Sequence, residues 1–452
     1  MDCLAQLASH TEQLSNAVTD LVKSGHTSQS FEALNREMPN AKANILGSIA
    51  SIKALISGPD DLLQELAAQV ETLACLQWLA ESQILACIPL DLSIPTKDLA
   101  DLAGFPVSQL SRVIRLLATR GFLQEQEPSS VAHTPLSAYF LTNQSLLDAS
   151  VFMAESVVPA ALQSPKSLQR RGAAYGGPAE AAMGAVRPFL SALQERPKLR
   201  RQWAAYQRHA AGLHQEEQVL EVISGLNWSN LGSACIVEVN AKSTSMARSL
   251  AERFPNLRLT VQIRDDQPTP SLHENPTYSG TNDNPCRDSN DGLMEPDPPQ
   301  ANINGPSSCG TSLSVTYRSA GMPQHVKDAA VYILHLPTVT PRPSLGGSST
   351  FIIKSELQSY LGPLRVNGSI LLVLTTRLLP EPGSPCGPVV ETVARARDLC
   401  MRQLAGEGEM EMSEILGMIE ATRDNGGRLV VTNQLRAHNN LVVGLVVKHQ
   451  AS

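Results

Sequence analysis

None of the eight cysteines in this chain belongs to a CxxC pair. They are scattered over the sequence, at Cys3, Cys75, Cys87, Cys235, Cys286, Cys309, Cys386 and Cys400. Structural zinc sites and disulfide frameworks are typically recognised by short, regular cysteine spacings. The distribution therefore predicts no metal site and no disulfide framework, and it is typical of a reducing compartment such as the cytosol or the nucleus.

The chain also lacks a long apolar run and an excess of positive charge. No apolar run reaches the roughly 20 residues that a membrane span needs. Residues 1–19 contain no basic region ahead of an apolar stretch, so we expect no secretory signal. The net charge of −7 gives no electrostatic footprint for nucleic acid over the chain as a whole. The GxSxG, HExxH and P-loop signatures are missing as well.

The chain has 452 residues, of which 42% are apolar, and this is long enough for two or three domains. Residues 1–60 form an N-terminal helical segment, and residues 61–142 a second unit. A helical connector follows at 143–233, with a polar, glycine-rich linker near 162–187. From 234 to 452 short apolar strands alternate with helices. The interval 267–309 is so rich in Pro, Asn, Asp, Ser and Gly that we expect a disordered insertion.

The alternation of strands and helices in residues 234–452 predicts an α/β fold with a doubly wound sheet. Its four central strands are expected at Ala234–Val239, Leu257–Ile263, Ala329–Leu336 and Ser369–Thr375. Two further strands, Arg428–Gln434 and Asn440–His449, are separated by a polar turn and should form a hairpin at one edge. A helix from Met246 to Phe254 follows the first strand, with Ser243, Thr244 and Ser245 placed to cap it.

The unit at 61–142 has the pattern of a winged helix, which contains a helix-turn-helix. Thr96 is the expected N-cap of a short helix that Gly104 ends, and Phe105-Pro106 makes the turn. The next helix runs from Val107 to Thr119, with Val107, Leu110, Ile114 and Leu117 on its buried face. Gly121-Phe122-Leu123 and Val131–Thr134 supply the wing.

The opposite face of that second helix is a candidate contact surface for DNA or for a protein. It carries Ser108, Arg112, Arg115 and Thr119. DNA affinity comes largely from neutralised phosphates, whereas residues 61–142 contain nine acidic and four basic side chains. Charge therefore favours a dimerisation or partner surface over autonomous DNA binding, and leaves DNA contact indirect or weak.

Several segments together resemble the fungal O-methyltransferase family. They are Leu110–Leu117 with Gly121-Phe122, Thr134–Ser137, and Phe254–Gln262. Within that family the chain is most similar to methyltransferase-like co-activators of secondary-metabolite clusters, chiefly through Leu76–Asp91. The resemblance implies a Rossmann-like class I methyltransferase domain and a protein of the nucleus, or of both the nucleus and the cytoplasm. It also implies a zinc-cluster transcription factor as partner.

The positions that hold the cofactor in this family are altered here. Its glycine-rich loop falls on Asn240, Ala241, Lys242, Ser243 and Thr244, none of which is glycine. The ribose-binding acid is replaced by Ile263, with Asp265 and Asp266 nearby. The catalytic histidine falls on Val339, and His335 is out of register, with no acidic residue after it to orient it as a base. We expect no cofactor and no catalytic residue.

Three hypotheses follow from these residues. The first is a transcriptional co-regulator of a polyketide cluster built on an inactive, degenerate methyltransferase fold. The second is an active S-adenosylmethionine-dependent O-methyltransferase acting on an aromatic polyketide. The third, a DNA-binding regulator, is disfavoured by the acidic winged helix. An apolar face on helices from Asp61 to Leu85 would favour a homodimer.

Overall fold

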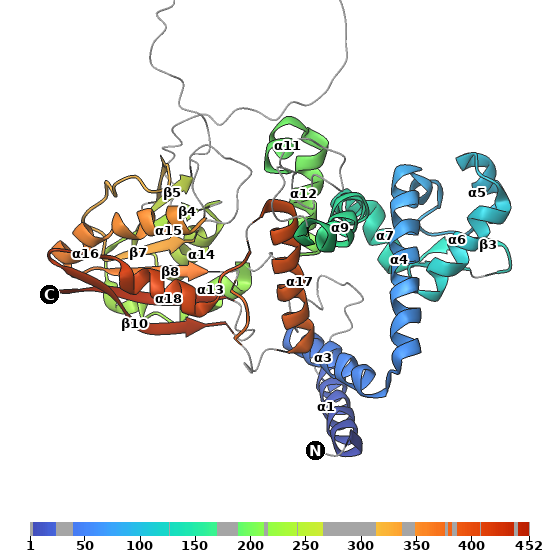
Figure 1. Cartoon of the computed structure of the whole chain (residues 1–452), viewed down its shortest axis with the longest axis horizontal. Coiled ribbons are helices and arrows are strands. Elements are labelled where there is room, and N and C mark those ends of the chain that lie inside the picture. Colours follow the sequence, from blue (N-terminus) through green and yellow to red (C-terminus); the bar gives the residue numbers. More distant parts are fainter. Residues whose placement is uncertain are drawn as a thin grey trace, which may run out of the picture.

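The structure is a computed structural model of the whole chain (Figure 1). The residues that it describes are 3–23, 39–125, 127–169, 189–211, 216–241, 243–264, 313–336, 349–375, 378–381, 387–406, 408–437 and 442–451. The expected insertion at 267–309 lies outside these ranges, as does most of the linker near 162–187.

Three helices open the chain, α1 (Cys3–Lys23), α3 (Pro39–Ile56) and α4 (Pro59–Glu81). Helices α1 and α3 pack on each other at one end of the molecule, and α4 extends from them along the second unit (Figure 1). Pro59 is the first residue of α4, and the Gly58 amide donates to the Asp61 carboxylate over 2.8 Å. Only the second half of α4 is buried, at Cys75 and Leu79.

The second unit contains two short helices joined by a tight turn and a small antiparallel sheet in the order β1-β3-β2. Its core gathers Leu79, Leu99, Leu110, Ile114 and Leu117. Its elements are η1 (Ile84–Cys87), β1 (Ile94–Pro95), α5 (Thr96–Ala103), α6 (Val107–Thr119), β2 (Leu123–Gln124), β3 (Ser130–His133) and α7 (Pro135–Thr142).

Both helices lie where the sequence predicts them, with two corrections. Pro95, not Thr96, is the N-cap of α5, and it offers no side-chain hydrogen bond. Gly104 ends α5 in the left-handed conformation, at φ +70, as its position predicts. Val107 is 40% exposed, so it is not part of the buried face of α6.

The connector is a helical layer between the two larger units. It comprises α8 (Gln144–Phe152), the π-helical turn η2 (Met153–Val157), α9 (Val158–Gln169), α11 (Phe189–Glu195) and α12 (Pro197–His209). Phe152, Phe189, Trp203 and Tyr206 form an aromatic cluster in its core. Helix α9 reaches Gln169, so the predicted start of the linker at 162 is wrong.

The continuous helix Gln144–Gln163 is long and apolar enough to cross a membrane by length and composition alone. The prediction that no apolar run reaches the roughly 20 residues of a membrane span is therefore wrong for this helix. Almost half of the window (44%) is buried inside the protein, and Phe152 is fully buried. Such burial is typical of the core helix of a globular domain.

The third unit is an eight-stranded sheet in the order β6-β5-β4-β7-β8-β11-β10-β9. Strands β6 to β8 in this order are parallel, whereas β11 is antiparallel to β8 and to β10. The strands are β4 (Cys235–Ala241), β5 (Arg258–Arg264), β6 (Leu313–Arg318), β7 (Val331–His335), β8 (Ile370–Thr375), β9 (Arg423–Asp424), β10 (Gly427–Arg436) and β11 (Val443–Ala451).

Helices cover both faces of this sheet, as a doubly wound architecture requires. One core contains residues of α13 and α14, and the other contains residues of α15, α16 and α18. Their bounds are α13 (Glu216–Ser224), η3 (Trp228–Leu231), α14 (Ser245–Arg253), α15 (Ser349–Gln358), α16 (Leu361–Asn367) and α18 (Met412–Ala421). Helix α17 (Pro388–Ala405) instead returns to the connector, where Cys400, Met401 and Leu404 join the aromatic cluster.

Candidate functional site

The crevice between β4 and β7 is the place where this fold positions a ligand. From β4 the chain passes to β5 on one side, and it later returns to β7 on the other side. Ligands of doubly wound sheets bind at such a switch point, beyond the carboxyl ends of the strands. Asn240 and His335 lie at these ends, on β4 and β7 respectively.

Asn240 is the first residue of the segment on which the family's glycine-rich loop is expected to fall, and its backbone has a left-handed conformation, with φ +57. Asparagine tolerates this region better than most residues. The side-chain amide of Asn240 donates to the main-chain carbonyl of His335 over 3.2 Å. The backbone of Asn240 therefore has the conformation that suits glycine, and its side chain adds a hydrogen bond between the ends of the two strands.

Glu238 and His335 form a pair across the same two strands. The imidazole Nε2 and the Glu238 Oε1 lie 3.0 Å apart. Glu238 is buried, whereas about a quarter of the His335 side chain is exposed (24%). His335 ends its strand, as predicted, but the prediction that it lacks an orienting carboxylate is wrong. The partner is 97 residues away in the chain, so local sequence could not indicate it.

Two acceptors at this switch point have no hydrogen-bond partner among the described residues. They are Oε2 of Glu238 and Oδ1 of Asn240, and both belong to buried residues. A buried carboxylate or amide oxygen without a donor costs free energy unless a water or a ligand supplies one. These two oxygens could therefore accept hydrogen bonds from a water or a ligand. The glycines that admit an adenosyl cofactor are nevertheless missing here.

The loop after Asn240 leads into α14, and its described part is polar. Thr244 is the N-cap of this helix without a side-chain hydrogen bond. Ser243 instead accepts from the Ser245 amide over 3.3 Å and lies 2.8 Å from the Ser245 hydroxyl. Capping is thus carried by Ser243 rather than by the whole Ser243–Ser245 run. Lys242 lies outside the described residues.

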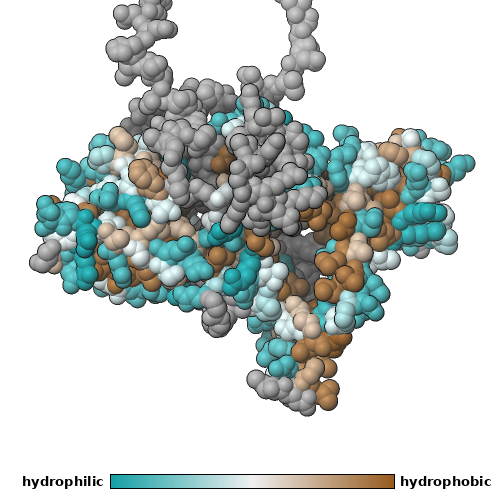
Figure 2. All heavy atoms as spheres, in the orientation of Figure 1, coloured by the Kyte–Doolittle hydropathy of each residue, from teal (hydrophilic) through white to brown (hydrophobic). Residues whose placement is uncertain are grey.

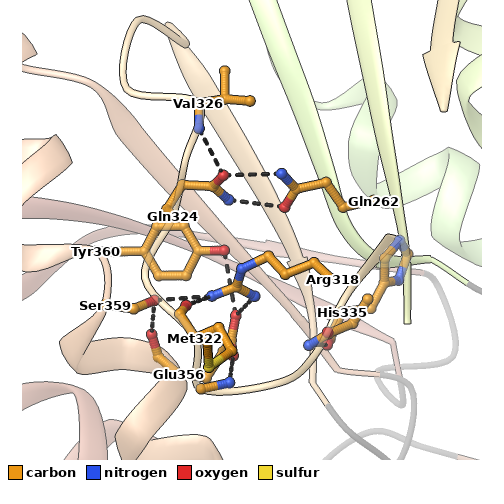
Figure 3. Close-up of polar contacts among 11 residues, drawn as sticks. Gln262, Arg318, Met322, Gln324, Val326, His335, Glu356, Ser359 and Tyr360 are labelled. Atoms are coloured by element: carbon orange, nitrogen blue, oxygen red, sulfur yellow. Dashed lines mark hydrogen bonds and ion pairs between the residues drawn. The ribbon is translucent and has the colours of Figure 1, made fainter. Parts of the chain in front are cut away.

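The end of β5 has no carboxylate for a ribose among its described residues. Ile263 packs against the core formed with α13 and α14. Its neighbour Gln262 points to the other face of the sheet, where it exchanges two amide hydrogen bonds of 2.9 Å with Gln324 (Figure 3). Asp265 and Asp266 lie outside the described residues. The position of the lost acid is therefore apolar, and the nearest polar side chain is already satisfied.

A buried ion pair fixes the adjoining end of β6. Arg318 Nη1 and Glu356 Oε1 are 2.5 Å apart, with side chains almost fully buried (Figure 3). The other Glu356 oxygen accepts from the Gly321 amide, and Arg318 also donates to the Met322 carbonyl. Burial, followed by the Glu356 charge, raises the pKa of Tyr360 far above its ordinary range. This network is internal, and we assign it a structural role.

Within the described ranges, no three His, Cys, Asp or Glu side chains gather as they would to hold a metal ion. Val339, the position of the family's catalytic histidine, lies outside those ranges. The structure thus brings Asn240 and His335 together, adds Glu238 to them, and leaves Ile263 in the neighbouring core.

The predicted contact face of α6 is solvent-exposed and lies in a different unit from the crevice. Ser108, Arg112, Arg115 and Thr119 are all exposed. Arg115 lies 3.3 Å from Glu125, which also accepts from the Ser129 amide. The Ser129 hydrogen bond and then Arg115 lower the pKa of Glu125. One of the two arginines is therefore partly neutralised by an acid that directly follows β2.

No family model matches the chain. Among curated proteins, it is 50% identical to the notoamide biosynthesis cluster transcriptional coactivator notR of an Aspergillus species, over 100% of this chain and 98% of notR. It is 42% identical to the transcriptional coactivator nsrH of Aspergillus novofumigatus and 36% to the monodictyphenone cluster transcriptional coactivator mdpA of Emericella nidulans. Both alignments cover 100% of this chain and 99% of the relative.

Among solved structures, the chain is similar to OxaC in complex with SAH and oxaline, with a TM-score of 0.58 and 15% identity. That match covers 99% of this chain and 100% of OxaC. The complex of LepI with SAM gives a TM-score of 0.61 at 14% identity, covering 96% and 100%. These likenesses show the fold alone, an α/β methyltransferase fold. With full-length identities of 36–50% to named coactivators, the chain belongs to the family of transcriptional coactivators of fungal secondary-metabolite gene clusters.

Proposed function

We propose that this protein activates transcription of a fungal polyketide gene cluster through a protein partner and transfers no methyl group. The partner would be the zinc-cluster transcription factor encoded in the same cluster, and the protein would act in the nucleus. The methyltransferase fold then serves as a scaffold that presents binding surfaces.

The observation that carries the proposal is the side chain of Asn240 in the cofactor crevice. Its hydrogen bond to the His335 carbonyl ties β4 to β7 at the point where the cofactor backbone contacts would form. Ile263 removes the acid that would hold the ribose, and its side chain faces a core. A ligand of the size of S-adenosylmethionine would have to displace these side chains without regaining their interactions.

Calorimetric titration of the full chain with S-adenosylmethionine and S-adenosylhomocysteine tests the inactive state. We expect no heat of binding at ligand concentrations that saturate an active O-methyltransferase of the same fold, measured in parallel. Micromolar affinity for either ligand would overturn the proposal of an inactive fold.

The exposed face of α6 is one candidate for contact with the partner or, weakly, with DNA. Its unit carries an excess of acidic side chains, and Arg115 is engaged by Glu125. A protein surface suits this charge better than a phosphate backbone. DNA would then be reached through the transcription factor.

A second copy of the chain is the expected occupant of an apolar surface on the N-terminal helices. Brown, hydrophobic surface follows α4 and the α1–α3 pair in Figure 2. Leu62, Leu63, Leu66 and Val70 on α4 are each about half to two-thirds exposed, and Ile49 and Ile56 on α3 continue the patch. Contiguous apolar surface of this kind is typical of an interface, and a homodimer would cover it.

An active O-methyltransferase on an aromatic polyketide is the alternative. The His335–Glu238 pair and the two unpartnered acceptors favour it, since a base needs an orienting carboxylate and a ligand needs unfilled acceptors. The same features are also explained by a bound water. The titration above separates the two, because methyl transfer requires the cofactor to bind.

A further inference from the structure

Helix α12 carries a line of arginines on its solvent-facing side. Arg200, Arg201 and Arg208 lie on α12, and Arg196 is its N-cap, with an extended backbone (φ −114, ψ 99); all four are exposed. Each step of four residues turns about 40° around a helix, so Arg196 to Arg208 wind over about 120° of the exposed side and rise about 18 Å along it. The position between them, Ala204, is small and exposed. We call these four arginines the arginine stripe.

The opposite side of α12 is fixed in the connector core. Gln202, Trp203, Ala205 and Tyr206 are buried there. Trp203 and Tyr206 contact Phe152 of α8, with ring centroids 5.5 and 5.3 Å apart. The arginine stripe is therefore held on a rigid element, and little order has to be created when it binds a partner.

The charge of the stripe is poorly balanced. Arg201 is paired with Asp148 at 2.8 Å, whereas Arg196, Arg200 and Arg208 form no ion pair in the part of the chain that the structure describes. The residues from Phe189 to His209 include five lysines and arginines and one acid, Glu195, in a chain of net charge −7. Cations at Arg196, Lys198 and Arg200 also oppose the dipole at the start of α12. Helix stability therefore does not explain them.

We propose that the arginine stripe is the docking site for an acidic, carboxylate-rich segment of a partner protein. The inference rests on the proposed coactivator function, for which a partner surface is needed. Guanidinium groups bind carboxylates through paired hydrogen bonds. Three arginines with no ion pair among the described residues, spread along one exposed side, suit several carboxylates along a short segment. DNA is disfavoured, because DNA affinity comes largely from neutralised phosphates and the chain has a net charge of −7.

The test uses the full chain and a fluorescein-labelled peptide of about 12 residues, in which glutamate alternates with serine and leucine. Fluorescence anisotropy should show saturable binding that weakens with added salt. The same peptide with glutamine in place of glutamate should not bind. The triple variant Arg196→Glu/Arg200→Glu/Arg208→Glu should lose at least about tenfold in affinity.

A matched control reverses three exposed arginines in another part of the molecule, Arg423→Glu/Arg428→Glu/Arg436→Glu on the β9–β10 segment (Figure 1). It should bind the glutamate peptide like the wild type. The double variant Arg196→Glu/Arg200→Glu places acids at the start of α12, where they stabilise a helix, so its loss of affinity cannot come from unfolding. A lysine-for-glutamate peptide should in turn gain affinity for the triple variant.

Equal binding by the stripe variant and the control variant would overturn the proposal, as would tighter binding of a DNA duplex than of the peptide. Measuring the transcripts of the cluster after loss of the gene distinguishes a failure of the docking-site proposal from a failure of the coactivator proposal. If the peptide does not bind but loss of the gene silences the cluster, the docking site is wrong and the coactivator function stands. If the peptide binds and transcripts are unchanged, the coactivator function is wrong.

Discussion

Asn240 and His335 are joined by a hydrogen bond of 3.2 Å from a side-chain amide to a main-chain carbonyl. The bond lies at the switch point between β4 and β7, where a doubly wound sheet receives its ligand. It forms while the backbone of Asn240 keeps the left-handed conformation that suits glycine. The turn of the fold is thus preserved, and its ligand-facing surface is not.

Two substitutions at Asn240 should separate the contribution of its left-handed backbone to stability from the contribution of its side-chain hydrogen bond. Asn240→Gly loses the bond but accepts φ +57 without strain, so the free energy of unfolding should fall by no more than about 1 kcal/mol. Asn240→Ala loses the bond and adds the strain, so it should be less stable than the glycine variant by about 1 kcal/mol. Urea unfolding measures both. Equal stability of the two variants would show that the left-handed turn imposes no constraint.

The buried pair of Arg397 and Glu409 should be essential for joining α17 to the connector. The guanidinium binds both carboxylate oxygens, at 2.5 and 2.7 Å, and donates to the Ala211 carbonyl at 2.9 Å. Arg397→Met leaves a buried, unpaired carboxylate, and we expect a loss of about 3–5 kcal/mol in urea unfolding. The control Arg402→Gln removes the exposed partner of Asp398, with 59% of the Arg402 side chain exposed, and should cost less than about 1 kcal/mol. Similar losses in both variants would contradict this account.

The apolar face of α4 should hold a homodimer together. Leu63→Glu/Val70→Glu places charges on that face, and sedimentation should change from dimer to monomer at micromolar concentration. The control Leu92→Glu/Leu102→Glu changes two side chains that are similarly exposed but lie before β1 and on α5, and it should remain dimeric. A wild-type monomer, or a dimer that survives the α4 variant, would rule out this interface.

Stability should fall in acid because of His133. Burial lowers the pKa of His133 below its ordinary 6.5, and this outweighs the hydrogen bond to the Leu85 carbonyl, which raises it. The unfolded state therefore binds the proton more readily, so stability is complete above about pH 6.5 and is lost as pH falls below it. Melting temperatures at about pH 8 and pH 5 should differ more for the wild type than for His133→Gln. The same difference in both would mean that other groups cause the effect.

Much of the fold could be predicted from periodicity alone. The bounds of α6 agree residue for residue, and the six predicted strands all appear within a few residues of β4, β5, β7, β8, β10 and β11. Strand β6 was missed, although Leu313, Val315 and Tyr317 alternate with polar residues. It follows directly after a polar interval, and its outward side chains are exposed, as is typical of an edge strand.

Some features of the candidate site can be predicted from the sequence, and others cannot. Loss of the glycines and replacement of the acid by Ile263 are visible in the sequence itself. The pairing of His335 with Glu238 depends on which strands lie side by side, and the arginine stripe depends on which face of α12 is buried. Both are properties of the tertiary structure, so no local motif could indicate them.

The central claim is that this chain regulates a cluster and does not modify its product. Deleting the gene in the fungus that encodes it, followed by transcript measurement across the cluster and analysis of its metabolites, tests this claim most directly. We expect the transcripts of the whole cluster to fall together and to recover when the wild-type gene is restored. Unchanged transcripts with accumulation of a single unmethylated intermediate would contradict the account.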